Sequence, residues 1–429
     1  MDYTYLYLLI IVLAVALYVR RHRRLQHAHA QELKQSLAAG LGEPPSLHPV
    51  INPSRCIGSG SCARACPEEA LGVVNGKAVL KNGSACIGHG ACLSACPVEA
   101  ITLVFGTEKR GIDIPHVSPE FETNVPGIYI AGELGGMGLI RKAAEQGRQA
   151  MDAIRRRANG SHDLDVLIVG CGPAGLSAGL AAIHHKLRYR LIEQEDSLGG
   201  AVYHYPRNKI AMTAPVQLAL VGKVKFGEVS KEQLLEFWQD VVKRTGLQVS
   251  FRERLVGIER SGDGFDVQTE HGRFSCRSVL LAMGRRGTPR KLDVPGEEAS
   301  KVVYRLVDAE QYRGQHVLVV GGGDSALEAA IALAGQPGTT VTLSYRSAAF
   351  ARVKAKNRDR LEEMRQSGAL QVLLSSTVKG IEQRQVNVEH EGRTLALPNQ
   401  AVIVCAGGEL PTPLLRKVGI QFETKFGTR

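Results

Sequence analysis

The hydrophobic positions of this 429-residue chain predict two buried strands, each leading into a glycine-rich turn and a helix. The first strand reads DVLIVG from Asp165, and the second reads HVLVV from His316. Short runs that are apolar at every position are typical of parallel strands covered on both faces. A third apolar run, from Tyr3 to Val19, has the length of a helix. The pattern therefore predicts an α/β protein with a separate N-terminal helix.

The N-terminal apolar run spans 17 residues, carries tyrosines near both ends and is followed at once by a basic cluster beginning at Arg20. This length is at the short end for a membrane-spanning helix, and tyrosines suit the membrane interfaces. A cleaved signal peptide would carry its basic residues before the run. We therefore predict a single-pass anchor in the cell membrane, with the N-terminus outside and the remaining chain in the cytoplasm. The alternative is a buried N-terminal helix of the core.

Composition and charge narrow the classes of partner. A net charge of +11 is compatible with nucleic acid or with anionic lipid headgroups. Because the chain contains no nucleic-acid-binding motif, we expect no nucleic-acid partner. Nine cysteines without a framework of pairs favour a reducing compartment. Residues 25–47, a His/Gln/Ala-rich stretch that runs into Gly-Glu-Pro-Pro, predict a helical stalk and linker.

Six of the cysteines lie in two near-copies of one pattern, thirty residues apart: CIGSGSCARACP from residue 56 and CIGHGACLSACP from residue 86. Each copy resembles the bacterial ferredoxin run C-x-x-C-x-x-C-x-x-x-C-P, with Ser59 or His89 at the second cysteine position. The resemblance implies a small α+β domain and two iron–sulfur clusters, with the fourth cysteine of each run serving the other cluster. The two implied ligand sets are Cys56, Ser59, Cys62 and Cys96, and Cys86, His89, Cys92 and Cys66.

The missing cysteines leave the cluster type open. A serine is far less acidic than a thiol, and a neutral imidazole adds no negative charge, so neither replaces thiolate well. Each site would hold either a 3Fe-4S cluster on three cysteines or a 4Fe-4S cluster with a weak fourth ligand. Alternatively Ser59 and His89 are ordinary loop residues. Zinc, which accepts three cysteines and a histidine, is a further alternative.

The strand that begins at Asp165 runs into the motif G-x-G-x-x-G and then a helix. In this setting glycines let the backbone approach a pyrophosphate at the helix N-terminus. An acid closes the next strand, RYRLIEQ, where it would bind ribose hydroxyls. With the Leu-Gly-Gly that follows, the motif resembles the FAD site of two-dinucleotide-domain flavoproteins. The implied FAD-binding residues are Gly170, Gly172, Pro173, Ala174, Gly175, Glu193, Gly199 and Gly200.

The strand that begins at His316 runs into a second motif, G-x-G-x-x-A. The following strand, TVTLSYR, ends in an arginine where an NAD site more often places an acid. Arginine there can bind the 2′-phosphate of NADPH, so we predict NADPH rather than NADH. The alternative is that these arginines are solvated surface cations. The predicted NADPH-binding residues are Gly321, Gly323, Asp324, Ser325, Ala326, Arg346 and Arg352.

Residues 162–429 resemble the thioredoxin reductase family, and more narrowly its bacillithiol-disulfide-reductase-like branch. The resemblance rests on the order of the two glycine motifs, on GGGDSA, and on LAMGRRGTPRKLDVPGE, which adds Gly284 to the FAD site. Thioredoxin reductases carry a C-x-x-C dithiol just before the second glycine motif. Here that stretch is VVYRLVDAEQYRGQ, without cysteine. Electron transfer to disulfides in the thioredoxin reductase manner is therefore not expected.

The C-terminus lacks the Gly-Asp element that faces the flavin in this family, and a matching element occurs upstream in residues 122–151. The segment NVPGIYIAGE places Gly132 and Glu133 at the flavin-facing positions, with glutamate instead of aspartate. A helix with an apolar face from Ile140 to Ile154 follows. We interpret the arrangement as a circular permutation, which domain termini that lie close together make tolerable. The alternatives are a segment swapped between two subunits, which implies a homodimer, and an unrelated linker.

The predicted fold class is α/β, with two Rossmann-like domains for FAD and NAD(P)H preceded by the ferredoxin domain and one transmembrane helix. The predicted order is anchor (1–24), stalk and linker (25–47), ferredoxin domain (48–105), FAD-closing segment (106–158), FAD domain (159–300 and 407–429) and NAD(P)H domain (301–406).

The predicted function is an oxidoreductase that takes a hydride from NADPH onto FAD. It would exchange single electrons with two clusters and with a redox protein or membrane electron carrier. The alternatives are a reductase of a small-molecule disulfide and a redox sensor without turnover. The sequence assigns no catalytic acid, base or nucleophile.

Overall fold

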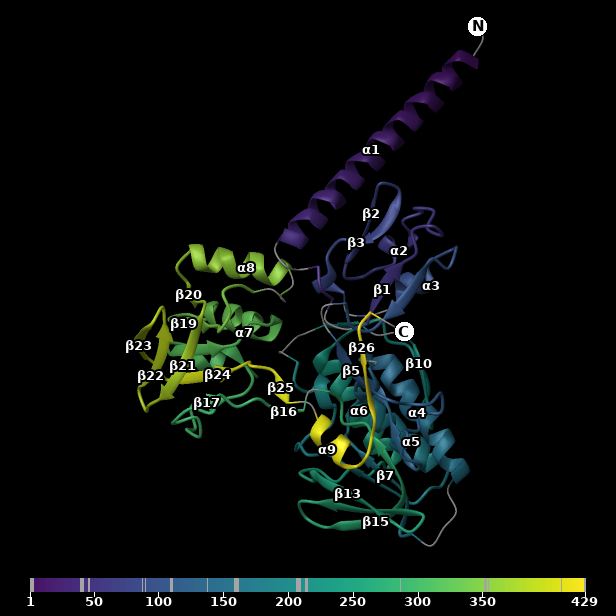
Figure 1. The fold of residues 1–429 in the computed structure, drawn as a ribbon, viewed down its shortest axis with the longest axis vertical. Helices are drawn as coiled ribbons and strands as arrows, with labels where there is room; N and C mark the ends of the chain where they lie inside the picture. The colour runs from purple at the N-terminus through teal and green to yellow at the C-terminus, as the bar shows by residue number, and fades with distance from the viewer. Residues whose placement is uncertain are drawn as a thin grey trace. The chain divides into compact units, whose positions relative to one another are not determined.

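The computed structural model describes residues 4–38, 42–44, 47–86, 88, 90–108, 111–136, 138–157, 162–205, 210–212, 215–285, 287–350, 353, 355–409 and 411–427 (Figure 1). The chain divides into two compact units. The first consists of Met1–Ile112 with Ala349–Glu362 and Thr424–Arg429, and the second of Asp113–Ala348 with Glu363–Glu423.

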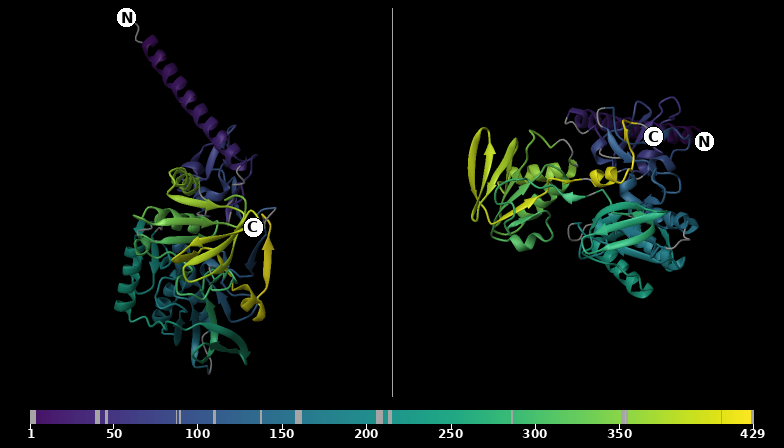
Figure 2. Two further views of the ribbon diagram at one scale, coloured as in Figure 1. Left: turned by 90° about the vertical axis from the view of Figure 1, so that its left-hand side faces the viewer. Right: turned by 60° about the horizontal axis from the view of Figure 1, so that its bottom comes forward.

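The N-terminal apolar run and the basic cluster behind it belong to one unbroken helix, α1 (Thr4–Ala38), as the left view of Figure 2 shows. Side chains of its first half, such as Leu9 and Ile11, are exposed, so it is not a core helix. Among the described residues, no helix is long and apolar enough to cross a membrane. The predicted single-pass anchor, its orientation and the membrane location are therefore wrong. The apolar run is shorter than the about 20 residues that a bilayer requires, and the helix continues directly into arginines.

The second half of α1 packs against a hairpin of the ferredoxin region. The ring Nδ1 of His29 lies 3.1 Å from the amide nitrogen of Val73. Further along the helix, Glu32 forms an ion pair with Lys81 at 2.6 Å, and the Lys81 side chain is only 9% exposed. The segment predicted as a stalk therefore contacts the ferredoxin region through its helical turns.

Two antiparallel strand pairs and two short helices build the ferredoxin region. The elements are β1 (His48–Ile51) paired with β4 (Ile101–Val104), β2 (Leu71–Val74) paired with β3 (Lys77–Leu80), α2 (Ser61–Arg64), α3 (Ala91–Ser94) and the 3-10 turn η1 (Gly83–Ala85). The two cysteine runs adopt the same backbone. Gly60 and Gly90 both have a positive φ and precede α2 and α3, and Glu69 and Glu99 both have a positive φ after the Cys-Pro.

The second unit contains a sheet of six strands that holds the first glycine motif. Its order is β13-β14-β15-β7-β8, and β6 pairs with β15. The elements are β6 (Ile128–Ile130), β7 (Leu164–Val169), β8 (Tyr189–Ile192), β13 (Leu255–Ser261), β14 (Gly264–Thr269) and β15 (Arg273–Leu281). β7 pairs in parallel with both β8 and β15, as the apolar pattern predicts, while β13, β14 and β15 are antiparallel.

Helices α4 (Ile140–Arg157) and α5 (Pro173–His184) pack closely together on this sheet (Figure 1). Met151 and Ile154 of α4 are completely buried in the same core as Leu176 and Leu180 of α5. β6 and α4 both come from the segment that precedes the FAD domain in the sequence. β6 pairs in parallel with β15 of the same chain, with Ile128 opposite Val279.

The second glycine motif belongs to a five-stranded parallel sheet of order β17-β24-β18-β19-β20. Its elements are β17 (Val302–Val303), β18 (His316–Val320), α7 (Asp324–Ala334), β19 (Thr340–Ser344), β20 (Leu370–Leu373) and β24 (Ala401–Val404). An antiparallel sheet of β21 (Ser376–Ile381), β22 (Gln385–His390) and β23 (Arg393–Pro398) completes this domain. The short pair β16 (Thr288–Pro289) and β25 (Gly408–Glu409) connects it to the FAD domain.

Smaller elements complete the chain: β5 (Ile112–Pro115), η2 (Gly132–Gly135), η3 (Gly200–Val202), β9 (Ile210–Met212), β10 (Val216–Leu218), β11 (Gly222–Val224), β12 (Glu228–Ser230), α6 (Lys231–Thr245), η4 (Ala309–Tyr312), α8 (Ala355–Gln366), α9 (Thr412–Lys417) and β26 (Phe422–Lys425). After β25, Leu415 and Ile420 are buried against Ile128 and Ile130 of β6. Helix α9 and the turn that follows it therefore pack on the FAD domain.

Candidate flavin and iron–sulfur sites

The first glycine motif forms the turn between β7 and α5. Gly170 has φ of 103°, a conformation that favours glycine, and a Cβ atom there would lie 2.6 Å from the carbonyl oxygen of Ala282. A Cβ atom on Gly175 would overlap the carbonyl oxygen of Gly170. At Gly172, by contrast, a Cβ atom would meet nothing closer than 3.9 Å. This glycine therefore leaves room for a ligand at the N-terminus of α5, where partial positive charge suits a phosphate.

Glu193, at the end of β8, is fixed against this turn. One carboxylate oxygen accepts a hydrogen bond from the amide of Cys171 at 2.7 Å, and the other accepts one from the amide of Glu195 at 3.0 Å. Burial raises the pKa of this carboxyl, and the two amide hydrogen bonds partly offset the effect. The remaining lone pairs can accept hydrogen bonds from ribose hydroxyls.

Gly132 and Glu133 follow β6 and lie near the same turn. The amide of Gly132 donates a hydrogen bond of 2.8 Å to the side chain of Gln146 on α4, which fixes the start of η2. A Cβ atom on Gly132 would lie 3.1 Å from the Cβ atom of Ala174. Glu133 reaches toward Gly284, since a Cβ atom on that glycine would lie 3.8 Å from the Glu133 carboxylate.

A cavity of about 840 Å³ joins these parts, a volume in the range of cofactor sites. It brings together nine of the residues predicted for FAD: Gly132, Glu133, Gly170, Gly172, Pro173, Ala174, Glu193, Gly200 and Gly284. The other two support the walls. Gly175 packs against the turn, and the amide of Gly199 donates a hydrogen bond of 2.9 Å to the carbonyl of Cys171.

The cavity is also lined by charged residues to which sequence reasoning gave no role, among them Glu195, Glu253 and Arg305. The Arg305 guanidinium contacts the ring of His204, and Glu195 lies within 4.0 Å of both side chains. Arg305 belongs to the stretch that replaces the dithiol of thioredoxin reductases, and its neighbours Tyr304 and Val307 also line the cavity. Of the described residues that line this cavity, none is a cysteine.

The second glycine motif has a similar geometry between β18 and α7. A Cβ atom on Gly321 would overlap the carbonyl oxygen of Cys405, whereas one on Gly323 would meet nothing within 4 Å. Asp324 and Ser325 begin α7, and Ala326 is completely buried. Arg346 is exposed just beyond the end of β19, and Arg352 lies outside the described residues. The residues thus leave space for a pyrophosphate, with one cation near the expected adenosine ribose.

In the ferredoxin region the cysteines form two groups, and each group combines both runs. Cys56 and Cys62 line one small pocket with Cys96 from the other run, together with Ser59. Cys86 and Cys92 line a second pocket with Cys66. These groups correspond to the crossed ligand sets that the ferredoxin resemblance implies.

The thiols sit in a partly apolar environment. Burial raises the pKa of Cys92 to about 11 and also raises the pKa of Cys62 and Cys86. Metal binding would therefore have to drive their deprotonation, which couples cluster insertion to folding. Amides already point at two sulfurs of one group: Ala78 to Cys56 at 3.4 Å and Ala100 to Cys96 at 3.2 Å. Such hydrogen bonds tune cluster potentials.

Clusters and zinc place different demands on the geometry of the thiols. Zinc requires all of its sulfur ligands within about 2.3 Å of one ion, whereas each cysteine of a cluster binds a different iron. Among the described side chains, no group of three or more His, Cys, Asp or Glu is placed to hold a single metal ion. His89 lies outside the described residues. Ser59 is exposed, and its hydroxyl lies 3.3 Å from that of Ser61.

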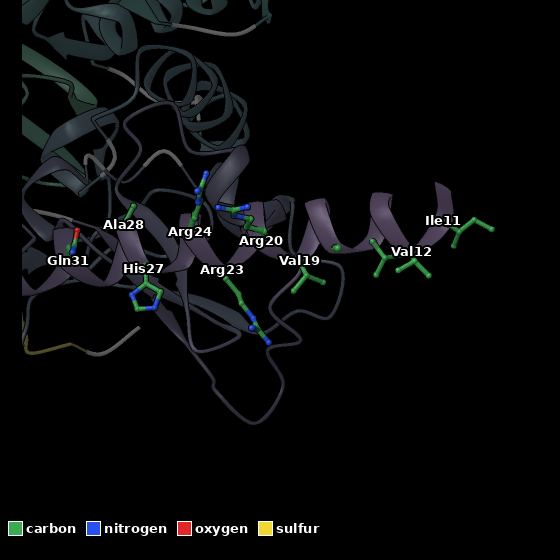
Figure 3. Close-up of a pocket in the computed structure, with 11 residues that line it drawn as sticks. Ile11, Val12, Val19, Arg20, Arg23, Arg24, His27, Ala28 and Gln31 are labelled. Atoms are coloured by element: carbon green, nitrogen blue, oxygen red, sulfur yellow. The ribbon is translucent and has the colours of Figure 1, made fainter. Parts of the chain in front are cut away.

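A groove also lies along α1, apart from the flavin cavity and from the two pockets of cysteines. Figure 3 shows its lining side chains, which run from Ile11 and Val12 to Arg24 and Gln31. All of them belong to this one helix, so the groove is a surface feature of α1. It contains none of the residues predicted for FAD, NADPH or iron.

Comparisons with known proteins find matches for both parts of the chain. Residues 167–427 match the pyridine nucleotide-disulphide oxidoreductase family, and residues 48–97 match a 4Fe-4S dicluster domain. A ferredoxin–NADP reductase of Ignicoccus hospitalis is 30% identical over 58% of this chain and 78% of its own length. A ferredoxin–NADP reductase of Thermus thermophilus is 32% identical over 57% of this chain and 72% of its own length.

Two solved structures of bacillithiol disulfide reductases are also similar. The Staphylococcus aureus protein is 24% identical with a TM-score of 0.52, covering 61% of this chain and 81% of that one. The Bacillus cereus protein is 25% identical with a TM-score of 0.51, covering 60% and 81%.

These matches define the class of protein. Because the family match covers more than half of the chain, the protein belongs to the pyridine nucleotide-disulphide oxidoreductase family. It is an NAD(P)H-dependent flavin oxidoreductase that carries a ferredoxin-type 4Fe-4S domain.

Proposed function

We propose that this protein transfers electrons between NADPH and a redox partner through FAD and two iron–sulfur clusters. One observation carries the proposal: two crossed thiol sets occur on the same chain as a flavin cavity that no described cysteine lines. FAD in this cavity would accept an electron pair and release it as single electrons, which joins a nicotinamide to clusters. The names of the ferredoxin–NADP reductases among the relatives support the same reading.

The residues of the FAD site have separate binding roles in this proposal. The backbone at Gly170 and Gly172 binds the pyrophosphate at the start of α5, and Glu193 binds the adenosine ribose. Glu133 and the start of η2 lie against the flavin end of the cavity. In the second domain, Gly323 admits the NADPH pyrophosphate, and Arg346 binds the 2′-phosphate.

A circular permutation explains the order of the segments. β6 pairs in parallel with β15, next to β7, and Glu133 at its end lines the cavity. The element that closes the flavin site thus comes directly after the ferredoxin domain in the sequence. This order would tie the clusters covalently to the flavin-facing element.

The rival function, reduction of a small-molecule disulfide, is supported by the fold of the bacillithiol disulfide reductases. It has little support from thiols near the flavin cavity. Cys171 is completely buried in the first glycine turn, where burial raises the pKa of its thiol far from the physiological range. Such a thiol is a packing residue rather than a nucleophile.

The test is to purify the full chain anaerobically, to count iron and sulfide, and to record absorption and EPR spectra before and after adding NADPH. We expect FAD absorbance to bleach and cluster signals to change together. A Cys62→Ala variant should lose one cluster signal while FAD still bleaches. Bleaching without any change in the wild-type clusters would contradict the proposal and favour the disulfide reductase.

A further inference from the structure

The two groups of cysteines differ in how closely a partner protein can approach them. The first group consists of Cys56, Cys62 and Cys96, and the second of Cys66, Cys86 and Cys92. In the first run, Ile57 directly follows Cys56, and its side chain is 66% exposed. In the second run, the Cys86 sulfur lies 3.9 Å from the carbonyl oxygen of Leu47, and a Cβ atom on Gly88 would lie 2.8 Å from that oxygen. The described part of the second loop is therefore covered, whereas the first loop is open at Ile57.

The surface around the first loop is positively charged. Residues 51–64 contain two arginines and no acid. One of them, Arg64, is exposed and places its guanidinium 3.3 Å from the hydroxyl of Ser61. Lys77 of β3 reaches the loop from the neighbouring hairpin, where its ammonium donates a hydrogen bond of 2.6 Å to the carbonyl of Cys56. Two cations from different elements therefore lie beside the same short loop.

Helix α1 brings further positive charge to this edge of the ferredoxin region. A Cβ atom on Gly58 would overlap the carbonyl oxygen of Gly76 in the hairpin turn, so the loop and the turn are in contact. The amide of Gly76 in turn donates a hydrogen bond of 3.1 Å to the side chain of Gln26 on α1. Arg23 lies three residues before Gln26, on the neighbouring helical turn of the same face, and is exposed. Figure 3 shows its side chain projecting from the helix.

Charge also separates the first group from the second. Glu68 lines the pocket of the second group, whereas none of the described residues that line the first pocket is acidic. Arg55 of the first run is offset by an ion pair with Glu99 at 3.6 Å. The excess positive charge therefore comes from Arg64, Lys77 and α1. Such a surface attracts an acidic protein and repels a basic one.

We propose that single electrons pass between this protein and its partner at the first cysteine group, and that the partner is a small one-electron protein with an acidic docking face. This inference rests on the proposed function, because it requires a cluster on the first group. Ile57 would be the apolar centre of the contact, with Arg64 and Lys77 at its rim. A partner that covers Ile57 comes within one residue of Cys56. One electron crosses the contact, so that one centre is oxidised as the other is reduced, and no bond forms or breaks.

The test uses two one-electron proteins of opposite charge as probes, an acidic rubredoxin and a basic cytochrome c. Binding to the full chain is measured by titration calorimetry with all proteins oxidised and without NADPH. We expect rubredoxin to bind at least about tenfold more tightly than cytochrome c at low salt. Its affinity should fall as the ionic strength rises from about 20 to 200 mM, because salt screens exposed charges.

Variants locate the contact. Lys77→Gln and Arg64→Gln should each raise the Kd for rubredoxin about 3- to 10-fold, and Ile57→Glu should raise it at least about tenfold, because it removes the apolar centre and adds repulsion. Lys243→Gln, at an exposed position of α6, and Val256→Glu, at a 48% exposed position of β13, are the matched controls and should keep the wild-type Kd. Counts of iron and sulfide verify that each variant retains its clusters.

Contrary results separate this inference from the proposed function. If cytochrome c binds as tightly as rubredoxin, or if the changes at Lys77, Arg64 and Ile57 affect binding no more than their controls, the docking surface is wrong even where NADPH reduces the clusters. If Ile57→Glu instead dissociates a dimer of this chain in sedimentation velocity, the surface binds a second copy and the proposal is refuted. If NADPH bleaches FAD but leaves the clusters oxidised, the proposed function fails although rubredoxin binds. A wild type without iron would refute both.

Discussion

Glu193 accepts a hydrogen bond of 2.7 Å from the amide of Cys171, which links the end of β8 to the first glycine turn. The contact places a buried carboxylate at the point where two parallel strands end. Burial raises the pKa of this carboxyl above its ordinary value of 4.5. The site therefore carries an electrostatic cost in the apoprotein that does not depend on FAD.

This cost predicts a pH dependence of stability. Where the folded carboxyl has the higher pKa, the folded state binds more protons than the unfolded state, so stability falls as pH rises. The loss begins as the unfolded carboxyl ionises near pH 4.5 and is complete above the raised folded pKa. In urea unfolding of the apoprotein, we expect wild type to lose stability relative to Glu193→Gln between pH 4.5 and neutral pH. A constant difference between the two proteins across this range would contradict the assignment.

The packing of α4 on α5 predicts an unusual effect of adding one methyl group. A Cβ atom on Gly147 would overlap the carbonyl oxygen of Ala174, in the first turn of α5. Glycine to alanine inside a helix ordinarily stabilises by about 1 kcal/mol. Here we expect Gly147→Ala to destabilise by about 1–3 kcal/mol and to weaken FAD binding, because the helices must separate. Denaturant unfolding of the apoprotein and FAD titration measure the two effects.

The matched control is Gly257→Ala in β13, where an added Cβ atom would meet nothing within 4 Å. It should change stability by less than about 1 kcal/mol and leave FAD binding unaltered. If Gly147→Ala proved as benign as this control, the close approach of α4 to α5 would be wrong.

The docking of α1 predicts a local effect on the ferredoxin region. Removing the charge of Glu32 would leave the ammonium of Lys81, which is 9% exposed, without its partner at 2.6 Å. We expect Glu32→Gln to lower the free energy of local opening by about 1–2 kcal/mol, less than for a fully buried pair because Glu32 is itself 42% exposed. Hydrogen exchange of the β2–β3 amides measures this change in the free energy of opening.

The exposed ion pair of Lys291 with Glu298, at 2.9 Å, provides the comparison. Glu298→Gln should have almost no effect on the opening of its surroundings, since exposed pairs contribute about 0–1 kcal/mol. Equal effects of the two changes would mean that α1 does not depend on this contact.

The sequence predicted the parts of the site that depend on local pattern. The glycine turns follow from strand, glycine and helix signals within about twenty residues, and the crossed thiol groups follow from the resemblance of the repeated runs to ferredoxins. Glu253 was missed because its place beside Glu193 depends on pairing of distant segments, through Ser250 and Ile192. The RER stretch around it carries no motif. The membrane anchor was wrong because the apolar run that ends at Val19 is shorter than a bilayer requires, and no helix among the described residues is apolar enough over a spanning length.

Arg346 predicts the choice of nicotinamide cofactor. It is exposed beyond β19, where the second ribose of NADPH would carry its phosphate. Arg346→Ala should raise the KM for NADPH about 10- to 100-fold and change the KM for NADH little, because only NADPH has the phosphate. Arg393→Ala, at an exposed position of β23, serves as the control and should change neither. Parallel changes for both cofactors in Arg346→Ala would refute a specific phosphate contact.

Ser59 predicts the type of one cluster. Ser59 lines the same pocket as Cys56, Cys62 and Cys96, so a thiolate at this position would add a fourth sulfur ligand to that group. Ser59→Cys should convert a 3Fe-4S signal in EPR to a 4Fe-4S signal and lower the midpoint potential by about 100 mV or more, because thiolate adds negative charge. The control is Ser300→Cys, which introduces an exposed thiol in the second unit. It should change neither the EPR signal nor the midpoint potential. If Ser59→Cys left spectrum and potential as they are, the serine position would not be a corner of the cluster site.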